Sequence, residues 1–109
     1  MKLVIAIVQD EDAHKLLDKL MENNFGVTKL ASTGGFLRSG NTTLIIGVQK
    51  EKVDEVLNII KDLCKSRKQI TSYPATTTWS MGSYVPYPVE VQVGGATVFV
   101  VDVEEFKKF

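Results

Sequence analysis

The stretch from Thr28 to Gly47 concentrates the residues of this sequence that could hold a ligand. Two glycine-containing segments, Thr33-Gly34-Gly35 and Gly40-Asn41-Thr42, flank the central run Phe36-Leu37-Arg38. Adjacent glycines let backbone N–H groups approach a ligand closely and form concave sites for anions. The guanidinium group of Arg38 can pair with a phosphate. The stretch therefore has the chemistry needed to bind a small phosphate-bearing ligand.

Neutral polar groups and an aromatic ring add to this set. Thr28 and Asn41 supply hydrogen-bonding side chains, and the ring of Phe36 offers a surface on which a base can stack. The competing interpretation is a hairpin in which the glycines only turn the chain, because glycine pairs are common in turns. Chemistry alone leaves both interpretations open.

No constellation for catalysis or metal binding accompanies this stretch. His14 is the only histidine, and a general base normally needs a partner that positions it. Cys64, the only cysteine, extends the apolar face of a predicted helix and is expected in the core. One histidine and one cysteine cannot give the Cys/His spacing of a zinc site. Helix capping explains the acidic run Asp10-Glu11-Asp12. We therefore expect no catalytic residue, no metal and no enzymatic activity.

Composition bounds the class of protein. The 109 residues are 44% hydrophobic and 24% charged, which is ordinary for one globular domain over residues 1–109. Thirteen Lys and Arg balance 13 Asp and Glu, which argues against a nucleic acid polymer as the ligand. The basic run from Lys65 to Lys68 is interpreted as a solvated helix end. The lone cysteine and the short apolar run at Met1–Val8 favour a cytoplasmic protein that is not in a membrane.

Apolar periodicity places the binding stretch within an α+β domain. Amphipathic helices are predicted after Asp10 and after Lys50, and strands at Lys2–Val8, Val27–Ala31 and Thr42–Val48, the first buried on both faces. Strands at 89–93 and 96–101 are predicted to form a hairpin through Gly94-Gly95, with a short helix at 104–109.

This order is a ferredoxin-like βαββαβ fold with an extra C-terminal strand and a long loop before strand 4. The loop, residues 66–88, has no sustained periodicity, and loops of that length are often functional. Helices on one face of the sheet leave an apolar face open, which predicts an oligomer.

Four stretches carry a family resemblance over essentially the whole chain, weakest at residues 66–84. The run Thr28–Thr43 resembles the signature of the PII-like cyclic di-AMP receptor proteins of Gram-positive bacteria. The other matching stretches are Ile5–Asp10, Asn23–Phe25, and Pro86–Val91 leading into Val93–Val100.

The resemblance implies a PII-like homotrimer that binds cyclic di-AMP at its subunit interfaces. It assigns ligand contacts to Thr28, Gly35, Phe36, Leu37, Asn41 and Gly47, with Phe99 packing on a base across the interface. The chain departs from the family at Gly26 and Lys108, where members often have Arg and Gln, so Arg38 or Lys29 would have to substitute as the phosphate partner.

The long loop at Lys68–Tyr87 corresponds to the family's large mobile loop. We expect ligand binding to reorder it and so change the surface offered to an unidentified downstream protein. The alternatives are a PII-like sensor of another adenine nucleotide such as ATP, and a structural trimer without a ligand, related to metal-tolerance proteins of similar fold.

Overall fold

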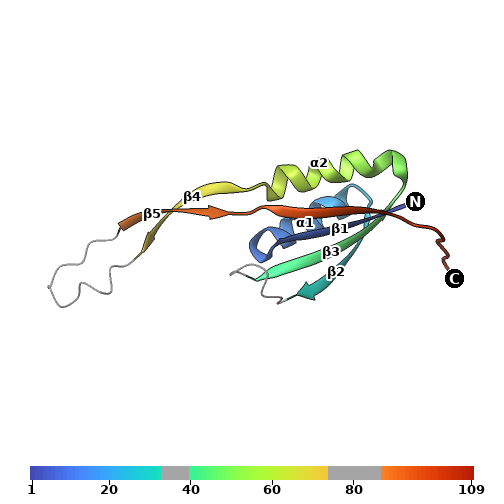
Figure 1. Cartoon of the computed structure of the whole chain (residues 1–109), viewed down its shortest axis with the longest axis horizontal. Helices are drawn as coiled ribbons and strands as arrows, with labels where there is room; N and C mark the ends of the chain where they lie inside the picture. The colour runs from blue at the N-terminus through green and yellow to red at the C-terminus, as the bar shows by residue number, and fades with distance from the viewer. Residues whose placement is uncertain (33–39, 74–86) are drawn as a thin grey trace.

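The computed structural model describes residues 1–32, 40–73 and 87–109. Four antiparallel strands form a sheet in the order β2-β3-β1-β6, and β4 and β5 form a separate two-stranded ribbon. Figure 1 shows this ribbon extending away from one end of the main sheet, and we call it the arm. The elements in chain order are β1 (Lys2–Gln9), α1 (Asp10–Glu22), β2 (Gly26–Ser32), β3 (Asn41–Val48), η1 (Lys50–Lys52), α2 (Val53–Cys64), β4 (Arg67–Tyr73), β5 (Tyr87–Val93) and β6 (Ala96–Asp102).

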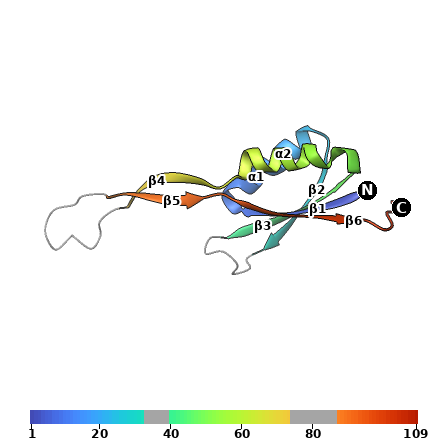
Figure 2. The same cartoon turned by 45° about the horizontal axis from the view of Figure 1, so that its top comes forward.

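Both helices cover the same face of the sheet and bury its core (Figure 2). Every second residue of a strand points to one face, and i, i+3 and i+4 positions share one side of a helix. The buried apolar residues follow both periods: Val4, Ala6 and Val8 from β1, Leu44, Ile46 and Val48 from β3, Ala13, Leu16 and Leu20 from α1, and Val56, Ile60 and Cys64 from α2. The core position predicted for Cys64 is confirmed.

The other face of the sheet, here the open face, is covered by neither helix. It exposes Leu30, Phe99 and Val101 by 44%, 52% and 45%. The prediction that the first strand is buried on both faces is therefore wrong. Only alternate residues of β1 are fully buried, and those facing the open side are half-buried.

The C-terminal half differs from the predicted hairpin. β5 pairs with β4 in the arm, whereas β6 pairs with β1 in the main sheet. Gly94 and Gly95, with φ of 80° and 101°, let the chain leave the arm and enter the sheet. The Gly94 N–H donates to Gln9 Oε1 at 2.7 Å, and the Gly95 N–H donates to the carbonyl of Cys64 at 2.5 Å. The two N–H groups thus fix the junction between the arm and the main sheet and do not close a two-residue turn.

Three smaller predictions fail in whole or in part. Residues 104–109 form no helix and stay exposed, because so short a segment finds no core to pack on. No side chain caps α1, whose N-cap residue is Gln9, so capping does not explain the acidic run. The basic run is a helix end only in part, because Lys65 is the C-cap residue of α2, whereas Arg67 and Lys68 already belong to β4.

The βαββαβ core with additional strands is confirmed as the fold, and β6 takes the place of the last core strand. Within the predicted loop at 66–88, residues 67–73 instead form β4, β5 begins at Tyr87, and residues 74–86 lie outside the described ones. Neither described helix has the length and apolar content needed to cross a membrane.

Candidate functional site

Thr28 and Phe99 share one rung of the main sheet. Thr28 pairs with Ile45, Ile45 pairs with Ile5, and Ile5 pairs with Phe99. Both predicted site residues are exposed on the open face, one on each edge strand. Three strand spacings of about 4.8 Å separate them by roughly 14 Å. Because this exceeds the reach of a single base contact, the two side chains of one chain cannot hold the same base.

Asn41 opens β3 directly after the glycine-rich segment. It pairs with Gln9 on one side and Ser32 on the other, and only 3% of it is exposed. Neither its Oδ1 nor its Nδ2 has a hydrogen-bond partner in the part of the chain that the structure describes. A buried polar group left unpaired costs about 1–3 kcal/mol, so native structures rarely keep one without a reason. One donor and one acceptor side by side suit the edge of an adenine.

Gly26 and Gly47 face each other across β2 and β3. A Cβ atom added at either glycine would meet no atom within 4 Å. Packing within the chain therefore does not require glycine at either position. Glycine weakens a strand, and a glycine within a strand often marks a place where a ligand or another backbone comes close.

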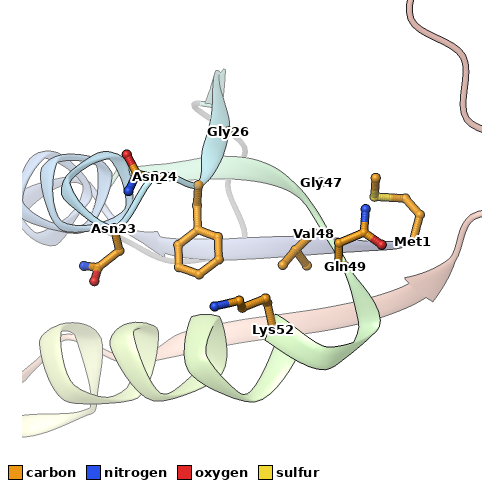
Figure 3. Close-up of a pocket in the computed structure, with 9 residues that line it drawn as sticks. Met1, Asn23, Asn24, Gly26, Gly47, Val48, Gln49 and Lys52 are labelled. Atoms are coloured by element: carbon orange, nitrogen blue, oxygen red, sulfur yellow. The ribbon is translucent and has the colours of Figure 1, made fainter.

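A hollow of about 340 Å³ adjoins this glycine pair (Figure 3). In Figure 3 the amino group of Lys52 is directed toward the Asn23 side of the hollow. No acidic residue lines it, so the hollow offers a cation and side-chain amides to an anionic or polar group. The sequence did not indicate it, because its lining comes from a helix end, two strand ends and η1: Met1, Asn23, Asn24, Phe25, Gly26, Gly47, Val48, Gln49 and Lys52.

The structure spreads the predicted residues along the sheet. Asn41 and Gly47 lie six residues apart on β3, which corresponds to about 20 Å of strand. Thr28 lies between them, beside Ile45. Asn41 is thus at the end of the sheet that carries the arm, and Gly47 is at the opposite end. Four predicted residues lie outside the described ones: Gly35, Phe36, Leu37 and Arg38.

Groups that could support other chemistry do not converge. His14 is exposed and lies 3.3 Å from the carboxylate of Asp18 on the same helix. Among the residues that the structure describes, no three His, Cys, Asp or Glu side chains form a metal-binding group. Burial, and secondarily the charge of Asp12, raises the pKa of the Cys64 thiol to about 11. Its thiolate is therefore scarce at neutral pH, which suits a core residue and not a nucleophile.

Two comparisons with known proteins are informative. The whole chain, residues 1–109, matches a family described as "Cyclic-di-AMP receptor". The fold also matches the crystal structure of a functionally unknown protein from Pediococcus pentosaceus, with a TM-score of 0.79 and 48% sequence identity. That match covers 99% of this chain and 96% of the other.

Proposed function

The chain belongs to the cyclic-di-AMP receptor family, and we propose that it binds cyclic di-AMP between the subunits of a homotrimer and signals through its arm. The family consists of signalling receptors and not of enzymes. In the cytoplasm, residues of neighbouring subunits hold the ligand, and the arm passes its presence on to a partner.

The unpaired amide of Asn41 is the observation that carries the proposal. It is buried beside the end of the glycine-rich segment and has both a donor and an acceptor without partners among the described residues. Asparagine pairs with adenine through two hydrogen bonds in this way. A bound adenine would satisfy both atoms, so the cost of burying them in the free protein is recovered on binding.

The positions of Thr28 and Phe99 favour an interfacial site. In one subunit they lie at opposite edges of the sheet, on a face that neither helix covers. Packing the open faces of three subunits together would bury apolar residues such as Leu30 and Val101. It would also bring the β2 edge of one subunit near the β6 edge of the next, where Thr28 and a second subunit's Phe99 contact one ligand.

The glycine-rich segment and the Gly47 region complete the proposed site. Gly35, Phe36 and Leu37 supply backbone groups and a ring for stacking, and Gly47 leaves room for the nucleotide. Because Gly26 offers no side chain, pairing with phosphate falls to Arg38 or Lys29. Lys52, in the hollow beside Gly47, is a third cation in reach of this end of the sheet.

Single variants test the site directly. Asn41→Ala and Phe36→Ala should each weaken cyclic di-AMP binding at least about tenfold in calorimetry, which is about 1.4 kcal/mol, while the trimer persists by light scattering. Lys61→Ala, on the exposed side of α2, is the matched control. Normal binding by both site variants would show that the site lies elsewhere. ATP binding in place of cyclic di-AMP would identify a different adenine-nucleotide sensor.

A further inference from the structure

We propose that the junction between β1 and α1, here called the turn, positions both the Asn41 region and the base of the arm. It thereby passes ligand occupancy from one to the other. This rests on the proposed function, since it assigns a route from that same site. The turn consists of Gln9 and the first turn of α1: Asp10, Glu11 and Asp12. Three of these residues, Asp10, Glu11 and Asp12, form the acidic run for which the sequence suggested helix capping, and no side-chain cap is present.

The first hold is on the residues that flank Asn41. The Asp10 N–H donates to the carbonyl of Gly40 at 3.1 Å, and Thr42 Oγ1 donates to Asp10 Oδ1 at 2.6 Å. A Cβ atom on Gly40 would collide with the Asp10 carboxylate, so the chain passes very close to the turn there. Asp10 therefore bonds to the residues on both sides of Asn41, to the backbone of Gly40 and to the side chain of Thr42.

The second hold is on the arm. Arg67, the first residue of β4, donates to both oxygens of Asp12, from Nη2 to Oδ1 at 2.8 Å and from Nη1 to Oδ2 at 3.3 Å. Asp12 is 1% exposed. Gly94, the residue after β5, donates its N–H to Gln9 Oε1 at 2.7 Å. Both strands of the arm are thus fastened to the same turn, where they leave the body of the protein (Figure 1).

The burial of Asp12 makes its pair with Arg67 costly to break, because a buried carboxylate that loses its partner is strongly unfavourable. Coupling between the two sites requires that bound ligand shift the balance between a paired and a released Arg67. Ligand contact with Asn41 immobilises Gly40–Thr42, which stabilises Asp10 and, two residues further on, the Asp12–Arg67 pair. The base of the arm becomes more ordered as a result.

Amide hydrogen exchange of the full-length protein, with and without saturating cyclic di-AMP, tests the route. In the wild type, ligand should slow exchange in β4 and β5 by about tenfold, within the usual range of coupling energies. Thr42→Val keeps the shape of the side chain but removes its hydroxyl. Asp12→Asn/Arg67→Gln removes the ion pair without leaving a buried charge unpaired. Both variants should still bind ligand, but in them the ligand should slow exchange in the arm by less than about twofold.

Lys68→Gln is the matched control, because the neighbouring Lys68 pairs with Glu90 on the exposed surface of the arm, at 3.4 Å. It should retain the full ligand effect. If bound ligand leaves exchange in the arm of the wild type unchanged, this route is wrong while the proposed function stands. The same holds if ligand slows exchange in the arm of Thr42→Val and of the double variant as much as in the wild type. A wild type that binds no cyclic di-AMP would overturn the proposed function, and this route with it.

Discussion

Thr28 and Phe99 lie on one rung of the four-stranded sheet and on the same open face, but on its two opposite edge strands. A separation of roughly 14 Å keeps them from contacting the same base within a subunit. If both contact the ligand, as we propose, they do so from different subunits, and the site is complete only in the oligomer.

Mixing two variants that each bind cyclic di-AMP weakly tests this arrangement. Thr28→Val and Phe99→Ala homotrimers should each bind cyclic di-AMP at least about tenfold more weakly than the wild type, which is about 1.4 kcal/mol. In a trimer refolded from both variants, one interface combines the intact Thr28 of one subunit with the intact Phe99 of the next. Calorimetry should then recover tight binding at a reduced number of sites. No recovery would mean that both residues act within one subunit or that Phe99 is outside the site.

Asn41→Ala should separate binding from stability. Because the buried amide has no partner among the described residues, its loss should cost the free protein less than about 1 kcal/mol. Thermal unfolding without ligand measures this, and the stabilisation added by saturating ligand should fall sharply. A large loss of stability in the free protein would show instead that Asn41 serves the fold.

Gly47→Ala should stabilise the free protein by about 0.5–1 kcal/mol, because alanine loses less entropy on folding and its Cβ meets open space. The same methyl group should lower ligand affinity if the nucleotide lies against this strand. Gly26→Ala, at the facing position with equally open space, is the control and should stabilise the protein with a smaller effect on binding. Unchanged affinity in Gly47→Ala would remove Gly47 from the site.

Cys64 should make stability fall in alkaline solution. Its pKa rises from 9.0 to about 11 in the folded protein, so the folded state holds this proton more tightly than the unfolded state. The stabilisation is complete below pH 9 and is lost as pH rises toward about 11. The free energy of unfolding should therefore decline more steeply over this range in the wild type than in Cys64→Ala. Equal slopes would contradict the assignment.

Local sequence pattern was sufficient for the first half of the fold. The apolar stripes of both helices, and the strands that alternate with them, follow from spacing alone because each buries one face against a single core. The second half was not determined in this way. The segments on either side of Gly94-Gly95 alternate as a hairpin would, and only their partners, β4 and β1, show that they belong to different sheets. β4 itself, from Arg67 to Tyr73, is mostly polar and gives little periodic signal.

In the candidate site, too, the sequence identified residues but not their arrangement. Residue type alone singled out Thr28 and Asn41, and the family resemblance added Gly47 and Phe99. The unpaired state of the Asn41 amide, the open space at Gly47 and the shared rung of Thr28 and Phe99 depend on strand register, which local sequence does not determine. Local sequence suggested a helix cap for Asp12 and could not indicate its actual partner, because Arg67 lies 55 residues away.

The most direct measurement is isothermal titration of the purified protein with cyclic di-AMP, with cyclic di-GMP and ATP titrated in parallel. We predict tight binding of cyclic di-AMP near one ligand per subunit and little heat from the other two nucleotides. Binding of ATP with no response to cyclic di-AMP, or no binding of any of the three, would contradict the account.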